Sequence, residues 1–275
     1  MHQYSVLMSV YHKDNSEHLS LSIKSMLEQS YLCSQFVIVK DGILNPSLDE
    51  VIDHYSLNNK NLFTIIQLKE NKGLGSALDI GLTYCKYEIV ARMDADDISL
   101  PTRCEEELEC FVKNSNLSIV GSYINEFYNN PDNVIASRHV PLEHDEIVKF
   151  ARRRSPFNHP TVMFKKTAVQ ESGGYGSSRR KEDLKLFPAM VNRGFEAMNI
   201  PKVLLLYRTN ADNAKRRKTW TNCKEYISVI YSNYRDGYST FFDFLYVLVA
   251  QIIIYLIPLR LFKYITKIFL RKKAG

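Results

Sequence analysis

Three carboxylates stand close together at Asp94-Ala95-Asp96-Asp97, directly after a mostly apolar run at residues 88–93. Carboxylates this close repel one another unless a cation or a solvated turn accommodates them. At the end of a strand they form an oxygen-rich site of the kind that Mg²⁺ or Mn²⁺ prefers, and such a metal keeps open positions for the phosphates of a substrate. The alternative is a polar turn in which Asp97 or Ser99 caps a helix that follows at Pro101.

The elements that would position this cluster alternate along the first part of the chain. Short apolar runs at residues 4–10, 36–39, 62–68 and 88–93 have the length of buried strands. Apolar residues recur at helical spacing within residues 19–27, 74–85 and 101–112. This alternation predicts an α/β fold, in which helices flank both faces of a mostly parallel sheet.

Polar or glycine-containing segments follow all four predicted strands. They are residues 11–15, Lys40-Asp41-Gly42, Asn71-Lys72-Gly73 and the aspartate cluster. Ligands of parallel sheets bind beyond the carboxyl ends of the strands. We therefore expect these four segments to meet along one edge of the sheet and to bind a nucleotide there.

The region from residue 114 to residue 194 has a less regular pattern. Its clearest element is a predicted helix at residues 182–193, which begins with Glu182 and Asp183 and contains Pro188. After it, two short extended stretches are expected within residues 195–206, on either side of Pro201.

The C-terminal tail differs in kind from the rest of the chain. Residues 244–259 are apolar except for Gln251, and this run is shorter than the roughly 20 residues that span a bilayer. Four basic residues then share one face of a predicted helix: Arg260, Lys263, Lys267 and Arg271. An apolar helix followed by a basic amphipathic one is typical of a monotopic anchor on an anionic membrane. A buried helix with a solvated end and a short spanning helix are the alternatives.

The composition is that of a globular chain with a basic second half. The chain has 275 residues, of which 45% are hydrophobic, and a net charge of +6. The basic runs at residues 152–154, 179–181, 215–218 and 271–273 indicate an anionic partner, unless they are solvated loops. We expect no nucleic acid among the partners, because these runs are scattered and aromatic residues rarely interleave with them.

The cysteines and the N-terminus indicate a reducing compartment. The five cysteines have no CxxC spacing, which predicts free thiols without a disulfide framework or a zinc site. The chain enters a strand pattern at once, with no basic segment followed by an apolar core. We therefore expect no signal peptide and a cytoplasmic catalytic part.

Taken together, these residues resemble the family-2 inverting glycosyltransferases of the Rossmann-like GT-A fold. The closest look-alikes are bacterial enzymes of O-antigen and exopolysaccharide assembly. The resemblance covers about residues 4–208, and its most specific stretch is 91–97; the other stretches are 5–11, 36–42, 71–81, 98–101, 159–164, 173–175 and 182–183. One departure concerns the position after the second strand, where the family often has two aspartates and this chain has Lys40 before Asp41.

The resemblance implies a metal and nucleotide site. Asp96 matches the last aspartate of the family's Asp-x-Asp motif and would be the main ligand of Mn²⁺ or Mg²⁺, while Asp94 would contact the ribose or the metal shell. Asp97 would contact the groups that bind the metal, without binding the metal itself, or it would cap the next helix. Arg92 would add a fixed positive charge nearby, or form a structural ion pair with an aspartate. The metal would bridge the two phosphates of the donor and stabilise the departing nucleoside diphosphate.

The resemblance also implies contacts with the base of the nucleotide. Asp41 matches the aspartate that contacts the base in the family, and Tyr11 would stack on the base or flank it. Lys72 and Gly73 would approach the nucleotide, with glycine allowing a close backbone contact. His159 is a metal or acceptor contact or a structural residue, and Arg208 is a possible phosphate contact.

The candidate for the catalytic base is Asp183, which matches the aspartate of the family's Glu-Asp motif. In an inverting transfer a carboxylate must take the proton of the attacking hydroxyl as the new bond forms. Glu182 would orient Asp183 or the acceptor. The alternative is that both are acids of a helix's first turn, favoured there by the helix dipole.

We predict a catalytic domain at residues 1–215 and a helical, membrane-associating segment at residues 216–275. The predicted reaction moves a hexose from a nucleotide diphospho-sugar to a glycan on a lipid such as undecaprenyl diphosphate. UDP is the expected nucleotide because it is usual in the resembled family. It would take place at the cytoplasmic face of the inner membrane. A sugar nucleotidyltransferase is disfavoured because residues 11–15 contain no glycine for a triphosphate loop, and a non-catalytic scaffold because Asp94, Asp96 and Asp183 are intact.

Overall fold

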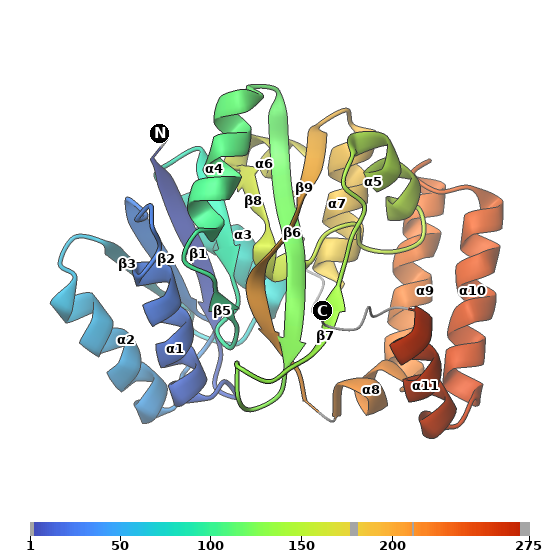
Figure 1. Ribbon diagram of the computed structural model, residues 1–275, viewed down its shortest axis with the longest axis horizontal. Helices are drawn as coiled ribbons and strands as arrows, with labels where there is room; N and C mark the ends of the chain where they lie inside the picture. The colour runs from blue at the N-terminus through green and yellow to red at the C-terminus, as the bar shows by residue number, and fades with distance from the viewer. Residues whose placement is uncertain (1–2, 177–180, 211, 270–275) are drawn as a thin grey trace.

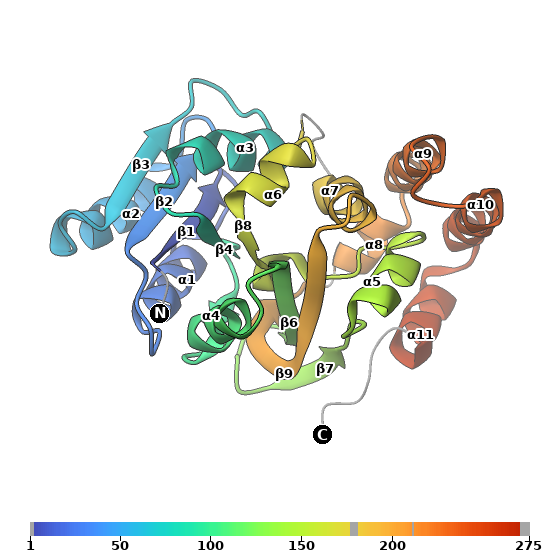
Figure 2. The same cartoon turned by 90° about the horizontal axis from the view of Figure 1, so that it is seen from above.

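The computed structural model describes residues 3–176, 181–210 and 212–269, and its strands form one twisted sheet with helices on both faces (Figures 1 and 2). The strands are β1 Tyr4–Val10, β2 Gln35–Lys40, β3 Phe63–Gln67, β4 Ile89–Met93, β5 Ile98–Ser99, β6 Leu117–Phe127, β7 Val134–Arg138, β8 Met163–Lys165 and β9 Glu196–Arg208. The helices are α1 Ser16–Leu27, α2 Pro46–Asn58, α3 Leu74–Tyr84, α4 Arg103–Lys113, α5 His144–Ala151, α6 Lys166–Glu171, α7 Glu182–Asn192, α8 Asp212–Arg217, α9 Trp220–Arg235, α10 Phe241–Leu256 and α11 Leu259–Phe269, with the 3₁₀ turn η1 His159–Thr161. The strand order is β3-β2-β1-β4-β8-β6-β9-β5, and β7 pairs with β6.

The first half of the sheet is parallel, as the sequence predicts. β1 pairs in parallel with both β2 and β4, and β2 pairs in parallel with β3. The predicted helices α1, α3 and α4 are present, whereas α2 was not predicted because Leu48 and Ile52 are its only buried residues. The carboxyl ends of β1 to β4 therefore open onto the same edge of the sheet.

The second half of the sheet is more regular than the sequence predicts. β6 is an eleven-residue strand that pairs in parallel with β9, while β8 joins the two halves by pairing antiparallel with β4 and β6. The expectation of an irregular region at residues 114–194 is therefore wrong for this strand. The strand lacks polar-apolar alternation because both of its faces are covered, so that Ser118 and Ser122 are also buried.

The two extended stretches expected around Pro201 are one strand, β9, with a break in its register. Ile200 pairs with Ser122 and Val203 pairs with Tyr123, so Pro201 and Lys202 bulge out of the ladder. A proline has no N–H to donate to a neighbouring strand and is confined to such positions. Beyond the bulge the strand continues to Arg208.

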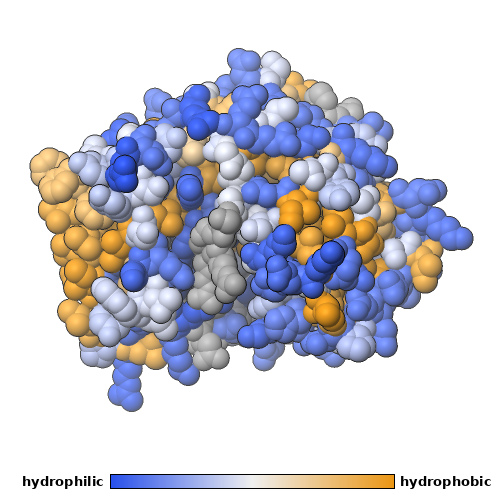
Figure 3. All heavy atoms as spheres, turned by 180° about the vertical axis from the view of Figure 1, so that it is seen from behind, coloured by the Kyte–Doolittle hydropathy of each residue, from blue (hydrophilic) through white to orange (hydrophobic). Residues whose placement is uncertain are grey.

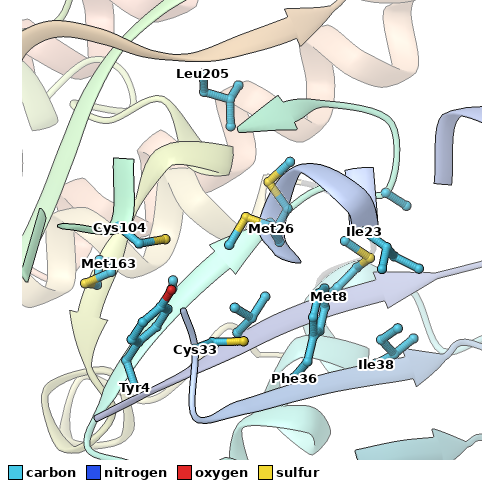
Figure 4. Packing of buried hydrophobic residues seen from close by; sticks show 14 of the residues in the cluster. Tyr4, Met8, Ile23, Met26, Cys33, Phe36, Ile38, Cys104, Met163 and Leu205 are labelled. Carbon is cyan, nitrogen blue, oxygen red and sulfur yellow. The ribbon is translucent and has the colours of Figure 1, made fainter. Parts of the chain in front are cut away.

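Two hydrophobic clusters fill the spaces between the sheet and its helices. The first lies under α1, α2 and α4 and includes Tyr4, Met8, Ile23, Phe36 and Cys104, which converge from separate elements in Figure 4. The second lies under α3, α6 and α7. All five cysteines are free and four of them are buried, which agrees with the expected structural thiols.

The C-terminal helices pack on α7 and on the segment that follows α5 (Figure 2). The side-chain amide of Asn233 in α9 donates to the carbonyl of Leu184 at 3.1 Å. Asp243 in α10 forms an ion pair with Arg153, with 2.6 Å between Oδ1 and Nε. These contacts join residues beyond 215 to the sheet domain.

The apolar and the basic parts of the tail are separate helices, as predicted. α10 ends at Leu256, slightly earlier than the pattern suggests, and α11 begins after Pro258. Within residues 3–176, 181–210 and 212–269, no helix has the length and the hydropathy to cross a membrane. Of the predicted basic face, Arg260 is exposed, while the side chains of Lys263 and Lys267 and all of Arg271 lie outside the described residues.

Candidate active site

The segments after β1, β2 and β3 meet at one edge of the sheet, and Asp41 ties them together. The Asp41 N–H donates to the carbonyl of Val10 at 2.7 Å. Its buried carboxylate accepts from the N–H of Lys72 at 2.7 Å and from the N–H of Gly73 at 3.0 Å. Gly73 has φ +88°, a left-handed conformation that favours glycine. Asp41 therefore shapes the loop that begins α3, and its contact with a nucleotide base stays a prediction.

Two further predicted nucleotide contacts lie beside this loop. The ring of Tyr11 is 39% exposed at the end of β1, and its N–H donates to Asp14 Oδ2 at 2.9 Å. Lys40, which replaces the first aspartate of the resembled pattern, pairs with Asp49 of α2 across 2.7 Å. The lysine is thus held by a helix that was not predicted.

The aspartate cluster follows β4 as predicted, and its three members have different surroundings. One carboxylate oxygen of each of Asp94, Asp96 and Asp97 lies within 4.8 Å of the others. Asp96 is exposed, Asp94 is partly buried and Asp97 is fully buried. Asp97 Oδ1 accepts from the N–H of Arg208 at 2.8 Å, and the Arg208 Nε donates to the carbonyl of Asp96 at 2.8 Å.

The helix-cap interpretation of this cluster is wrong. α4 begins at Arg103, and the residue at its cap position is Thr102. Ser99 lies in β5, where its hydroxyl accepts from the side-chain amide of Gln29 at 3.1 Å. Asp97 therefore anchors the end of β9 through Arg208 and caps no helix.

Charge within the cluster is only partly balanced. The Arg92 side chain is 1% exposed and contacts the Asp94 carboxylate. Burial lowers the pKa of Arg92, but the contact with Asp94 outweighs it and leaves that pKa above its usual value. Loss of surrounding water, followed by the charge of Asp94, raises the pKa of Asp96 to about 6. Burial and the charges of Asp96 and Asp94 raise the pKa of Asp97 as well.

These residues fit a divalent cation. Asp97 Oδ2 is buried and has no hydrogen-bond partner among the described residues, while Asp96 is open to solvent on the same site. Burial and then mutual repulsion raise both pKa values, and a cation bound among the carboxylates reverses the repulsion. Carboxylate oxygens alone suit Mg²⁺ or Mn²⁺ better than a softer metal.

Glu182 begins α7 and lies beside a buried row of polar side chains. Its Oε1 is 3.5 Å from His159 Nδ1, and His159 Nε2 is 3.4 Å from the hydroxyl of Tyr175. Burial and the charge of Arg92 hold the pKa of His159 well below its usual value, so the imidazole is neutral. Burial and the neighbouring Asp183 raise the pKa of Glu182 to about 7.

Asp183 has a different environment from Glu182, because it lines a cavity of about 960 Å³. The walls of this cavity come from β7, the segment after α5, the start of α7 and helices α9 and α10. The charges of Asp183, Arg92 and Asp94 all act on Glu182, so the aspartate cluster and the start of α7 lie within electrostatic reach of each other. A carboxylate on a cavity wall beside a metal site can take a proton from a bound hydroxyl.

Sequence reasoning missed part of this site. It left His159 open between a ligand and a structural residue, and the structure encloses its ring between Tyr175 and Phe187. It did not single out Arg138, because β7 was not predicted. The run at 152–154 was a visible signal, and Arg154 does line the cavity.

Comparison with known proteins agrees with the fold and the motifs. A family model described as glycosyl transferase family 2 matches residues 5–184. An Escherichia coli protein named UDP-Gal:alpha-D-GlcNAc-diphosphoundecaprenol beta-1,3-galactosyltransferase is 35% identical over 272 residues, which are 98% of this chain and 97% of that protein. An uncharacterized glycosyltransferase of Haemophilus influenzae is 34% identical over 270 residues, which are 98% of this chain and all of that protein.

Solved structures agree with the predicted fold class. A mannosyltransferase of Pyrobaculum calidifontis in complex with GDP-Man and Mn²⁺ matches with a TM-score of 0.65 at 16% identity. The match covers 93% of this chain and 70% of that chain. It confirms the α/β, Rossmann-like GT-A architecture with flanking helices.

Proposed function

Since this chain belongs to glycosyl transferase family 2, we propose that it is a metal-dependent hexosyltransferase that acts on a lipid-linked glycan. The observation that carries the proposal is that two acidic sites lie within electrostatic reach of Glu182. One is the cluster of Asp94, Asp96 and Asp97, and the other is Asp183, which lines the cavity.

The donor is a nucleotide diphospho-sugar, bound at the carboxyl ends of β1 to β4. Tyr11, Asp41, Lys72 and Gly73 follow β1, β2 and β3 at this edge and would contact the nucleoside. UDP is the proposed nucleotide because the similar Escherichia coli protein is named for UDP-Gal. Mn²⁺ or Mg²⁺, held by Asp94 and Asp96, would supply positive charge to the donor's phosphates.

The chemical step is an inverting displacement at the anomeric carbon of the donor hexose. An acceptor hydroxyl attacks from the face opposite the leaving group, its oxygen bonds to the anomeric carbon, and the bond to the β-phosphate oxygen breaks. The nucleoside diphosphate leaves with the bonding electrons, and Asp183 takes the proton of the hydroxyl. Glu182, held by His159, fixes the first turn of α7 and with it the position of Asp183. An α-linked donor gives a β-linked product.

The proposed acceptor is a sugar on a lipid diphosphate such as undecaprenyl diphosphate, in the assembly of an O-antigen or exopolysaccharide. The name of the Escherichia coli relative contains such an acceptor. Residues 1–215 would then form the catalytic domain, and residues 216–275 would bind the cytoplasmic face of the inner membrane as a peripheral segment. Support for this contact comes from apolar side chains exposed on α10, which gather at the left edge of Figure 3.

Nucleotide binding is the first test. Calorimetric titration of the full chain with UDP, GDP and dTDP, with and without Mn²⁺, is expected to detect UDP binding that requires the metal. Asp96→Ala should abolish the metal dependence, because it removes the main ligand. Equal binding of all three nucleotides without a metal would contradict the proposed donor site.

Transfer is the second test, with a labelled UDP-hexose and a lipid diphosphate sugar as acceptor. Asp183→Asn should lower kcat by about 10²- to 10⁴-fold, the range for loss of a general base, while leaving the affinity for UDP unchanged. Asp145→Asn is the matched control, because Asp145 is an exposed acid in the first turn of α5. Full transfer by both Asp183→Asn and Asp96→Ala would refute the mechanism.

A further inference from the structure

The cavity that Asp183 lines carries an excess of positive charge. Among the described residues, four acidic ones line it, Glu126, Glu146, Asp183 and Asp243, against seven basic ones, Arg138, Lys149, Arg152, Arg153, Arg154, Lys181 and Arg217. One opposite pair neutralises itself, since Arg153 bonds to Asp243 and lies 4.7 Å over the ring of Tyr246. This pair ties the segment after α5 to α10 and closes that side of the cavity.

Three of the remaining arginines line the same cavity from different elements. Arg138 ends β7, Arg154 follows α5 and Arg217 ends α8. Burial lowers the pKa of Arg138, and the positive charges of Arg154 and Arg217 lower it further. Within the described part of the chain, none of these three guanidinium groups has a carboxylate at ion-pairing distance.

Like charges gathered around one cavity destabilise one another unless an anion lies between them. Guanidinium groups bind phosphate oxygens with two parallel hydrogen bonds, which makes arginine the preferred residue for phosphate groups. The volume of about 960 Å³ exceeds what a single phosphate fills and has room for a diphosphate and an attached sugar. The donor's phosphates have their own site at the aspartate cluster.

We propose that Arg138, Arg154 and Arg217 bind the diphosphate group of the lipid-linked acceptor and set the acceptor sugar beside Asp183. This inference rests on the proposed function and names the group that the acceptor must carry. A diphosphate diester has two negative charges at neutral pH, which offset the repulsion among the arginines. The sugar that it carries then reaches toward Asp183 on the same cavity wall.

The path of the lipid follows from α10, which separates the cavity from an apolar surface. Tyr246 and Ile254 line the cavity from this helix, while Phe242, Val249 and Ile253 of the same helix are exposed. These exposed residues belong to the apolar region at the left edge of Figure 3. A polyprenyl chain on the diphosphate therefore leaves the cavity along α10 toward that surface.

The test compares three acceptors that carry the same sugar, N-acetylglucosamine, and the same decyl chain. The two are joined through a diphosphate, a monophosphate or a neutral glycosidic bond. We expect the diphosphate acceptor to have the highest kcat/KM. Arg154→Gln and Arg138→Gln should raise its KM about tenfold or more, as expected for loss of a charged hydrogen bond, and leave the KM of the UDP-hexose unchanged. Arg235→Gln, an exposed arginine of α9 that does not line the cavity, is the control and should change neither.

A second measurement separates this inference from the proposed function. The affinity for decyl diphosphate, measured by calorimetry without donor or metal, should fall in Arg154→Gln and in Arg217→Gln. Because Arg217 is exposed, its substitution keeps the test valid if Arg138→Gln does not fold. Such weakening without any transfer activity would support the cavity site and refute the proposed function.

Three results would overturn the inference while the transferase function stands. The first is equal use of the three acceptors by the wild-type enzyme. The second is a rise in the donor's KM that matches the rise in the acceptor's, which would assign the arginines to the donor. The third is weaker binding of Arg154→Gln to anionic vesicles with unchanged decyl diphosphate binding, which would assign them to lipid headgroups.

Discussion

His159 and Asp96 belong to one charged neighbourhood, but their replacement should have opposite effects on stability and metal binding. His159→Asn removes the partner of both Tyr175 and Glu182 in a largely buried place, so we expect the free energy of unfolding to fall by about 1–3 kcal/mol. Its affinity for Mn²⁺ should not change, because His159 is not part of the aspartate cluster. Urea denaturation and a Mn²⁺ titration of the same samples measure both quantities.

Asp96→Ala is the counterpart of this experiment. The Asp96 side chain is exposed and repelled by Asp94, so its loss should leave the free energy of unfolding within about 0.5 kcal/mol of the wild type. Mn²⁺ binding should disappear. If His159→Asn lost Mn²⁺ binding at unchanged stability, then His159 would be a ligand, and the structural role that we assign to it would be wrong.

At the scale of elements, the turn after α6 is fixed by α3. Asp79 of α3 accepts from the N–H of Tyr175 at 2.7 Å and from the N–H of Gly176 at 2.7 Å. Gly174 lies against the same carboxylate, since a Cβ added there would be 2.6 Å from Asp79 Oδ1. This turn holds Tyr175 against His159, and so α3 supports the start of α7 indirectly.

Gly174→Ala and Gly176→Ala form a matched pair that tests this contact. Both residues have positive φ, +69° and +72°, so each alanine should cost about 1–2 kcal/mol through the backbone. A Cβ at Gly176 meets nothing within 4 Å, whereas one at Gly174 collides with Asp79. We therefore expect a larger loss of unfolding free energy in Gly174→Ala, measured by urea denaturation. Equal losses of unfolding free energy in the two variants would show that the turn shifts away from Asp79 without a measurable energetic cost.

The parallel half of the sheet and the aspartate site were predictable, because each depends on short contiguous segments. β1 to β4 are uninterrupted apolar runs, and the rule that ligands bind at strand ends placed Asp41, Lys72 and Asp96 on one edge. β6 was not predictable in this way. Gly121 breaks its apolar pattern because a Cβ there would lie 2.5 Å from Asn199 Oδ1 and 3.0 Å from the ring of Phe157, which are contacts between distant segments.

The cavity that Asp183 lines could not be predicted, for the same physical reason. It exists because α9 and α10 pack against α7, with Asn233 bonded to Leu184 and Asp243 bonded to Arg153. Arg138 and Arg154 come to line one cavity in that arrangement. A pattern along the chain shows that a residue is basic, but only long-range packing determines whether its charge is solvated or enclosed.

At the scale of the whole molecule, different helices form the two opposite ends (Figure 1). α2 and the loop before it lie at one end, and α9 and α10 lie at the other. Large apolar side chains are exposed at both ends, but they are denser on α10, where nine are exposed: Phe241, Phe242, Leu245, Tyr246, Val249, Ile252, Ile253, Tyr255 and Leu256. We therefore expect the exposed apolar side of α10 to contact a membrane surface.

Replacing two exposed residues of α10 should therefore weaken membrane binding selectively. The native side chains of Ile253 and Leu256 are 50% and 71% exposed. The double variant Ile253→Ser and Leu256→Ser removes this apolar area, which should lower the affinity for vesicles about tenfold or more. The control is Ile43→Ser with Leu57→Ser, which are 82% and 68% exposed near α2. Co-sedimentation with vesicles that contain anionic lipid measures the affinity, and transfer to a short-chain acceptor in solution should stay unchanged in both variants. Equal weakening by the two pairs would mean that vesicle binding depends on general hydrophobicity, and α10 would then have no special role in holding the enzyme at its lipid substrate.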